Sequence, residues 1–400
     1  ERQAQETSES VVPQRDPETL REALDLELPE QGQDLETVGQ RLRELVRHTP
    51  TTASGSFFNQ LFGGREPASL LGETVAAALN NSMYTYKVGG AQVLVELELI
   101  HQMGLLVGFK AADGVFTPGG SLSNLSGMLL ARDRARPRLR EEGVGGPVLR
   151  VYSSEECHYS VAKAAALLGI GLDNLVYIAT DARGRMDPDA LEEAIRVDLA
   201  AGYRPMMVNA TAGTTVLGAF DPLDKLADVC ERHDLWLHVD GAFGGSAVLD
   251  PEQAHHLSGC DRADSMSWDA HKLMGAQISC SVLLVRERGL LARSLDENAS
   301  YLFQGDGREL NPGTRSLQCG RRNDALKLWT LWQTLGNAGL TERLAGFAMV
   351  DDEAVVRLPL VNAQAGEDEL ELLFAQLREV AAELRDEAAE SESSAKAIRA

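Results

Sequence analysis

Basic side chains and paired cysteines are scarce in this sequence. Only 38 of its 400 residues are Lys or Arg, against 60 Asp or Glu, and the formal net charge is −22. A surface of this charge repels phosphate backbones, so we expect no nucleic-acid partner. The five cysteines are odd in number and include no Cys-x-x-Cys pair. This predicts reduced thiols in a cytoplasmic protein, with neither a disulfide framework nor a zinc or other metal site.

Long apolar runs are also absent. No stretch reaches the length needed to span a bilayer, so we predict no membrane partner. The first 20 residues lack the basic start and the apolar stretch of a signal peptide, and we expect none. Residues 377–400 are predicted to form a solvated helix that fades into a tail. The length suffices for one large domain and a smaller one.

What the sequence does contain, from about residue 90 onward, is an alternation of strand and helix patterns. Residues 17–48 precede it and are predicted to be mostly helical. The predicted strands are 148–154, 174–180, 205–213, 235–240, 265–268 and 279–287, and the predicted helices are 91–108, one from about 124, 160–169, 190–202 and 222–234. The alternation predicts an α/β fold with a largely parallel sheet covered on both faces. Ligands of such sheets bind beyond the carboxyl ends of the strands, where this sequence has polar residues at 153–158, 209–215, 240 and 269–272.

Asp240 and Lys272 each follow a predicted strand. Taken singly, Asp240 would be a salt-bridged or capping carboxylate, Lys272 a lysine that reaches solvent, and His158 a structural histidine. Together they fit pyridoxal phosphate chemistry, which needs a lysine amine, a carboxylate that keeps the pyridine nitrogen protonated, and anion-binding backbone for the phosphate. The segment "GVFTPGGSLSNLSGMLLAR" (114–132) offers that backbone through its glycines and the start of its helix.

These residues lie in segments that resemble the group II pyridoxal-phosphate-dependent amino acid decarboxylases, of the glutamate and cysteine sulfinate decarboxylase branch. The matching segments run in the family's order over residues 57–329: "FFNQLF", "MYTYKVGGAQVLVELE", "GVFTPGGSLSNLSGMLLAR", "CHYSVAKAAALLGIGLDN", "VNATAGTTVLGAFDPL", "LWLHVDGAFGGSAVL", "SWDAHKLMG", "YLFQGD" and "QCGRRNDALKLW". The resemblance implies a fold type I pyridoxal-phosphate-dependent transferase, similar to aspartate aminotransferase. It implies an N-terminal helical, swapped segment (1–90), a cofactor-binding large domain with the mostly parallel sheet (91–335) and a small C-terminal α/β domain (336–400).

The resemblance also implies roles for the site residues. Lys272 would form a Schiff base with pyridoxal phosphate, Asp240 would pair with the ring nitrogen, and His158 would stack on the ring face. These three are the implied catalytic residues. The rest of the implied cofactor site is Gly120, Ser121 and His271 at the phosphate, Thr215 near the ring and Ala242 beneath it.

Substrate recognition is implied at three further positions. Asn59 and Gln60 would donate hydrogen bonds to the distal acidic group of the substrate, and Arg357 would bind a substrate carboxylate. Taken singly, they would be two satisfied amides and a surface arginine. The implied reaction is decarboxylation of an acidic L-amino acid, namely glutamate, aspartate or cysteine sulfinate, to the amine and CO₂. Family members are homodimers with a shared active site, so we expect "YLFQ" (301–304) and "QCGR" (318–321) to reach into the neighbouring subunit.

The sequence departs from the family pattern in four places. Asp269 stands where the family has the Asn of Asn-Pro-His-Lys, which places a carboxylate near the phosphate site, and Lys87 stands where the family carries Glu. The segment 305–317 is short and has no tyrosine, whereas family members have a longer loop whose tyrosine protonates the carbanion. Residues 344–350 run almost directly into 351–362, where the family has several dozen more residues of the small domain, so the small domain is expected to be incomplete around 350–351.

Three functions therefore stay open. The first is decarboxylation of an acidic amino acid. The second keeps the cofactor but links decarboxylation to oxidative deamination, or breaks another bond at the alpha carbon. The third is a non-catalytic family member that acts as a binding partner. Amine against aldehyde as the product separates the first two, and cofactor absorbance separates both from the third.

Overall fold

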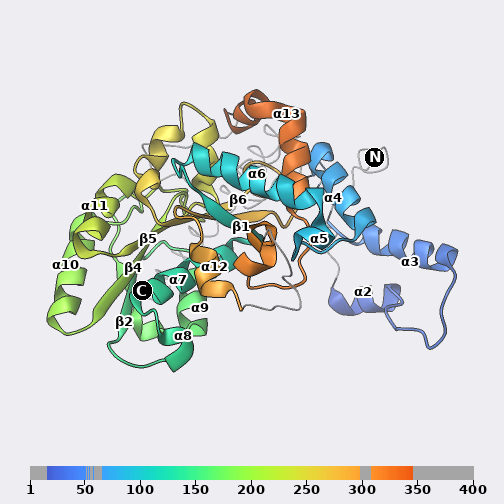
Figure 1. Ribbon diagram of the computed structural model, residues 1–400. Coiled ribbons are helices and arrows are strands. Elements are labelled where there is room, and N and C mark those ends of the chain that lie inside the picture. The colour runs from blue at the N-terminus through green and yellow to red at the C-terminus, as the bar shows by residue number, and fades with distance from the viewer. Residues whose placement is uncertain are drawn as a thin grey trace, which may run out of the picture. The chain divides into compact units, whose positions relative to one another are not determined.

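The computed structural model describes residues 16–50, 52, 54, 57, 65–297 and 308–345 (Figure 1). The chain divides into two compact units, Glu1–Asn59 with Asn362–Ala400, and Gln60–Val361. Several predictions lie outside the described residues: Asn59, Gln60, Arg357, the segment 301–304, the junction at 350–351 and the helix at 377–400. Their roles stay predictions, as do the bounds of the three predicted domains.

In the described part of the first unit, residues 17–48, which the sequence predicted to be mostly helical, form two helices. They are α2 (Pro17–Ala23) and α3 (Leu35–Arg47). Residues 24–34 between them are not helical. Pro29 lies in this stretch and removes a backbone donor that a helix would need, so the region is interrupted there.

A seven-stranded sheet organises the second unit. Its strands are β1 (Asp113–Thr117), β2 (Leu149–Ser154), β3 (Leu175–Ile178), β4 (Arg204–Thr211), β5 (Trp236–Asp240), β6 (Ser265–Asp269) and β7 (Ser281–Val285). The order across the sheet is β1-β7-β6-β5-β4-β2-β3. Neighbours from β6 to β3 pair in parallel, and β7 is antiparallel to both of its neighbours. The prediction of an α/β fold with a mostly parallel sheet is confirmed.

Helices connect the strands. The α-helices are α4 (Pro67–Leu79), α5 (Tyr86–Gly89), α6 (Ala91–Leu106), α7 (Gly120–Ala135), α8 (Leu139–Glu142), α9 (Ser160–Leu167), α10 (Pro188–Ala200), α11 (Leu223–His233), α12 (Leu290–Leu295) and α13 (Ala325–Ala345). The 3₁₀ helices are η1 (Leu172–Asn174), η2 (Gly244–Leu249), η3 (Ala254–Leu257), η4 (Cys260–Arg262), η5 (Arg308–Leu310) and η6 (Pro312–Arg315). Among the described residues, no helix is both long enough and apolar enough to cross a membrane.

The predicted start of one helix is wrong. α7 begins at Gly120, earlier than the predicted start near Asn124. Glycine has low helix propensity, so the two glycines Gly119 and Gly120 concealed the first turn. Tertiary packing explains the early start: a Cβ on Gly120 would lie 2.8 Å from Oδ2 of Asp269, so the helix begins directly against the end of β6.

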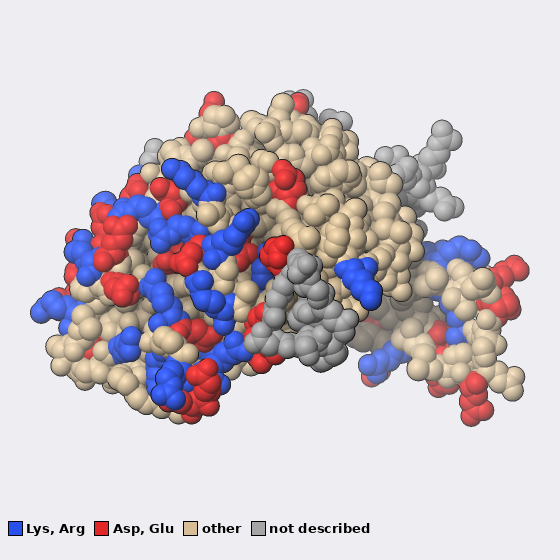
Figure 2. Space-filling model, viewed as in Figure 1, with Lys and Arg blue, Asp and Glu red and all other residues tan. Residues whose placement is uncertain are grey.

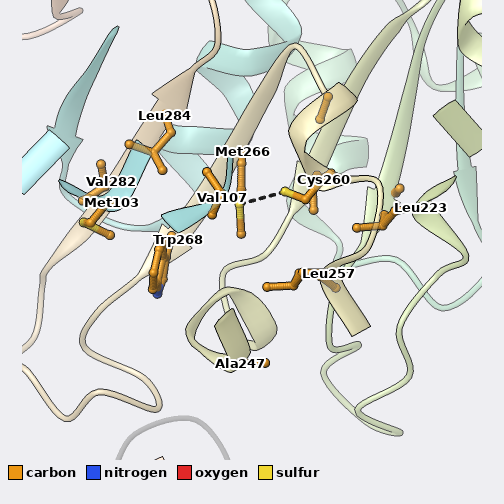
Figure 3. Close-up of a cluster of buried hydrophobic side chains, with 14 of the residues drawn as sticks. Met103, Val107, Leu223, Ala247, Leu257, Cys260, Met266, Trp268, Val282 and Leu284 are labelled. Carbon is orange, nitrogen blue, oxygen red and sulfur yellow. Dashed lines mark hydrogen bonds between the residues drawn. The ribbon is translucent and has the colours of Figure 1, made fainter. Parts of the chain in front are cut away.

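Side chains of the sheet alternate between two buried clusters. Val282 and Leu284 of β7 belong to a cluster with residues of α6, α10, α11 and α13, whereas Leu283 and Val285 belong to a cluster with residues of α7, α9 and α12. Figure 3 shows part of the first cluster, where Met266 and Trp268 of β6 lie near residues of neighbouring elements. This period of two is that of strands buried on both faces, as the sequence predicted.

Candidate functional site

Polar residues end the strands at one edge of the sheet. β4, β5 and β6 are parallel, and β1 ends at the same edge because β1 and β6 both pair antiparallel with β7. The register places Asp240 beside Ser267, and it places Ser281 between Thr117 and Asp269. The strand ends that the sequence singled out therefore meet, which is where ligands of such sheets bind.

Asp240 is a buried carboxylate at the end of β5, and its residue is 4% exposed. Its Oδ2 accepts a hydrogen bond from Nδ2 of Asn124 at 2.7 Å, and its Oδ1 accepts one from the backbone N–H of Ala242 at 3.1 Å. The hydroxyl of Ser267 lies 3.5 Å from Oδ1. Within the described part of the chain, no lysine or arginine forms an ion pair with Asp240. The negative charge of Asp240 is therefore stabilised by neutral hydrogen-bond donors, and a cationic ligand would add the missing opposite charge.

Asn124 belongs to the site although the sequence analysis gave it no role. Besides Asp240, its Nδ2 donates to Oγ of Ser160 at 2.9 Å. Its Oδ1 accepts from Oγ of Ser267 at 2.6 Å and lies 3.0 Å from Nε2 of His238. The carboxylate of Asp240 can only accept, and the hydroxyl of Ser267 donates to the other end of the amide. These partners fix the orientation of the Asn124 amide, with its NH₂ group facing Asp240.

His238 is the second residue that the sequence analysis missed. Its side chain is fully buried, and its Nδ1 lies 2.8 Å from Oγ of Ser265, which accepts from Nε1 of Trp236 at 2.8 Å. Because the amide oxygen of Asn124 can only accept, the ring proton of His238 lies on Nε2, and Nδ1 then accepts from the Ser265 hydroxyl. Burial lowers the pKa of His238 to about 4, although Asp240 opposes the shift, so the ring is neutral near pH 7. The signal for its role was the strand period of two, which puts His238 and Asp240 on one face.

His158 lies between β2 and α9 and is half-buried. Its Nδ1 accepts the backbone N–H of Ser160 at 3.2 Å and lies 2.8 Å from the Ser160 hydroxyl. An accepting Nδ1 leaves the proton of the neutral ring on Nε2. Burial lowers the pKa of His158, with Asp240 opposing and Lys272 adding to the shift. Ser160 and Asn124 connect His158 to Asp240 through hydrogen bonds.

Lys272 follows β6 in a turn and meets Asp269. Its Nζ lies 3.3 Å from Oδ2 of Asp269, and Nε2 of His271 lies 3.7 Å from the same oxygen. Oδ1 of Asp269 accepts from Oγ of Ser281 at 2.5 Å. The side chain of Asp269 is 3% exposed and that of Lys272 is 19% exposed. The carboxylate that departs from the family pattern is therefore paired within the site.

Gly120 and Ala242 line the same place. A Cβ on Gly120 would lie 3.2 Å from Cβ of Ala242 and 2.8 Å from Oδ2 of Asp269. The backbone N–H of Asp269 donates to the carbonyl of Ala242 at 3.2 Å. Ser121 lies exposed in the first turn of α7. The structure thus brings the start of α7, the turn after β5 and the turn after β6 together.

Thr215 is less closely integrated. It lies half-exposed in the turn after β4, and no hydrogen bond among the described residues joins it to the other predicted site residues. Its predicted role near the ring stays a prediction.

The described end of the tyrosine-free segment, 308–317, packs against residues 84–86. Oδ1 of Asn311 accepts from the backbone N–H of Tyr86 at 2.9 Å, and the N–H of Gly313 donates to the carbonyl of Tyr84 at 2.9 Å. In the predicted interface segment 318–321, Arg321 pairs with Glu96 of its own chain through two hydrogen bonds of 2.8 Å.

These residues fit pyridoxal phosphate. Asp240 is a buried carboxylate held only by neutral donors, which suits a protonated ring nitrogen. Lys272 offers a primary amine, and the glycine start of α7 leaves space that a Cβ would fill. One feature fits the phosphate poorly, because the carboxylate of Asp269 occupies the same neighbourhood.

Comparison with known proteins indicates the same cofactor. Residues 17–350 match the pyridoxal-dependent decarboxylase conserved domain. The chain is 46% identical to the cysteine sulfinic acid decarboxylase of Mus musculus over 342 residues, 84% of this chain and 69% of that protein. It is 44% identical to an acidic amino acid decarboxylase of Bos taurus over 346 residues, 85% of this chain and 66% of that protein. The crystal structure of mouse CSAD superposes with a TM-score of 0.82 at 44% identity, covering 86% of this chain and 72% of that one.

Proposed function

Because the chain belongs to the pyridoxal-dependent decarboxylase family, we propose that it removes CO₂ from an acidic L-amino acid and releases the amine. Family membership makes it a pyridoxal-phosphate-dependent carboxy-lyase. The names of its relatives support cysteine sulfinate or another acidic amino acid as substrate, and we propose glutamate and aspartate as the alternatives. The observation that carries the proposal is the meeting of Lys272, Asp240 and His158 at one edge of the sheet.

The cofactor, when bound, supplies an electron-withdrawing ring that weakens the bonds at the substrate's alpha carbon. Lys272 supplies the amine that attaches it covalently. Gly120, Ser121 and His271 would hold the phosphate, and Ala242 and Thr215 would lie against the ring.

Asp240 would act by keeping the ring nitrogen protonated. Its carboxylate is buried and oriented by Asn124 and by the backbone N–H of Ala242, so it is already aimed before a ligand arrives. In a poorly solvated site, a fixed negative charge stabilises a nearby positive charge more strongly than in water. Neutral His238 supports this arrangement by holding the oxygen of Asn124 away from Asp240.

Replacement of a carboxylate by hydrogen requires one proton at the alpha carbon. The ammonium form of Lys272 is the group of this chain that we propose to deliver it, leaving the free amine behind. The neutral ring of His158 can donate a hydrogen bond through its Nε2–H but does not give up that proton. The accepting Nδ1 of His158 fixes its donating nitrogen on the other side of the ring. His158 would also restrain the cofactor by packing on the ring face.

The surface supports a homodimer as the working form. Figure 2 shows few charged side chains over α4, α5 and α6, whereas charges of both signs are interspersed over α10 and α11. Exposed apolar side chains on these three helices are Leu71, Val75, Leu79, Tyr86, Leu94 and Leu105. We propose that a second copy of the chain covers this surface and shares the active site. Five free cysteines support a reducing, cytoplasmic location.

Oxidative deamination linked to decarboxylation is a second candidate. It is favoured by the segment 305–317, which has no tyrosine to protonate the carbanion. Its product would be an aldehyde, formed with consumption of O₂ and release of ammonia.

The experiment that tests both candidates incubates the holoenzyme with cysteine sulfinate, glutamate and aspartate. We expect CO₂ and the amine from at least one of them, identified by mass. An aldehyde with O₂ uptake would favour the second candidate. Lys272→Ala is expected to abolish both turnover and the visible absorbance of covalently bound cofactor. If both survive in this variant, the assignment of Lys272 is wrong.

A further inference from the structure

Asp269 places a fixed negative charge at the start of α7. Its Oδ2 lies 2.8 Å from the position of a Cβ on Gly120, 3.3 Å from Nζ of Lys272 and 3.7 Å from Nε2 of His271. The side chain is 3% exposed, so water screens its charge poorly.

The surroundings of Asp269 are an anion-binding cluster. Lys272 and His271 lie in the turn after β6, and α7 begins beside Asp269 at Gly120. The hydroxyl of Ser281 in β7 donates to Oδ1 of Asp269 at 2.5 Å. The same hydroxyl lies 3.1 Å from that of Ser123, which in turn lies 2.7 Å from that of Thr117. The charge of Asp269 also acts on two neighbouring groups, because it tends to raise the pKa of His158 and that of the buried Cys280 thiol. The side chains of Lys272, His271 and Ser281 therefore already face an internal carboxylate.

We propose that Asp269 is the resident anion of the cofactor site, which competes with the phosphate of pyridoxal phosphate for His271 and the start of α7, and so makes cofactor binding weak and reversible. The inference rests on the proposed function. Without cofactor, Asp269 pairs with the ammonium of Lys272. With cofactor, two anions share one cluster, and like charges at this range repel. The enzyme would therefore load and release its cofactor as the cofactor concentration changes.

The test compares pyridoxal phosphate with pyridoxal, which has the aldehyde and ring but no phosphate. Dissociation constants are measured by absorbance titration of cofactor-free wild type and Asp269→Asn. The variant keeps the side-chain shape and an oxygen for Ser281 while it removes the charge. We expect Asp269→Asn to bind pyridoxal phosphate about tenfold more tightly or better, with a change of less than about threefold for pyridoxal. Inorganic phosphate should compete with pyridoxal phosphate more strongly in the variant.

The ratio between the two ligands isolates the phosphate. A change in the reactivity of Lys272, or a structural effect, would move both dissociation constants by the same factor, and that result would overturn the proposal. Asp173→Asn, an exposed carboxylate in η1, makes the same change in net charge and should leave the ratio unchanged. Asp269→Ser gives the same comparison should Asp269→Asn fail to fold. Failure of wild type and both Asp269 variants to bind pyridoxal phosphate at all would instead overturn the proposed function.

Discussion

Asp240 and Asp269 end neighbouring strands of one sheet, yet their buried carboxylates have opposite surroundings. Asp240 is held by the Asn124 amide and a backbone N–H. Asp269 is held by the Lys272 ammonium and the Ser281 hydroxyl. Among the described residues, Asp240 has only neutral donors and can therefore take up a cation. Asp269 already has a cationic partner, Lys272. Two residues of the same type at equivalent strand ends thus have opposite effects on the proposed ligand: Asp240 favours a cationic ring, whereas Asp269 disfavours an anionic phosphate.

The largest expected difference between the two carboxylates is in turnover. Asp240→Asn removes the only buried negative charge proposed for the ring nitrogen. Breaking a buried charge pair typically costs about 3–5 kcal/mol, so kcat should fall roughly 10²- to 10⁴-fold. Cofactor affinity should fall in Asp240→Asn and rise in Asp269→Asn, which is measured by titration of each cofactor-free variant. Changes of the same sign in both variants would remove the distinction between the two sites.

The next effect is on the free energy of unfolding at acidic pH. It concerns His238, the neutral histidine that contacts the amide of Asn124 beside Asp240. The pKa of His238 lies at about 4 in the folded protein because of burial, below the usual value of 6.5. The unfolded chain therefore binds an extra proton between these values, and folding stability is lost as the pH falls from about 6.5 to 4. The loss is about 3 kcal/mol for this one group, and His158, also lowered by burial, adds to it in the same direction.

His238→Gln should flatten this pH dependence because glutamine does not titrate. Unfolding free energies from urea titrations at several pH values measure the slope. His101→Gln, at an exposed position of α6, is the matched control and should keep the wild-type slope. A His238→Gln slope equal to that of wild type would mean that His238 is protonated in the folded state.

A smaller effect is expected from the amide that orients Asp240. Asn124→Ala removes a hydrogen bond to a charged group, which typically stabilises by about 1.5–3 kcal/mol. Asn81 is a useful reference because its amide donates to the neutral carbonyl of Val88 at 2.9 Å. Asn81→Ala should cost only about 0.5–1.5 kcal/mol and leave cofactor affinity unchanged. Equal costs in urea unfolding would show that the charge of Asp240 does not strengthen its bond to Asn124.

The smallest effect compares the two serines beside the carboxylates. Ser281 lies 2.5 Å from Asp269, whereas Ser267 lies 3.5 Å from Asp240. Each Ser→Ala change should cost about 1 kcal/mol of unfolding free energy, with Ser281→Ala the more costly because it leaves a buried carboxylate oxygen without its donor. The reverse order would indicate that the bond from Ser267 to Asn124, at 2.6 Å, dominates.

The sequence predicted the fold well where local pattern and tertiary packing agree. The apolar run before Asp240 and the alternating run before Asp269 became β5 and β6, because buried strands need just such patterns. It failed at the start of α7, where glycine propensity pointed away from a helix and packing against Asp269 decided otherwise. It also missed Asn124 and His238, which form no local motif and meet only across the sheet face.

By itself, the sequence determined the order of strands and helices and the chemistry-bearing residues at the strand ends, since hydrophobic period and residue type are local properties. Only the tertiary structure decided which charge each carboxylate meets. Asn124 and Asp240 are 116 positions apart, and Ser123 and Ser281 are 158 apart. Hydrogen bonds and ion pairs act over a few ångströms in a poorly screening interior, so the packing of α7 against the sheet fixed the electrostatics of the site.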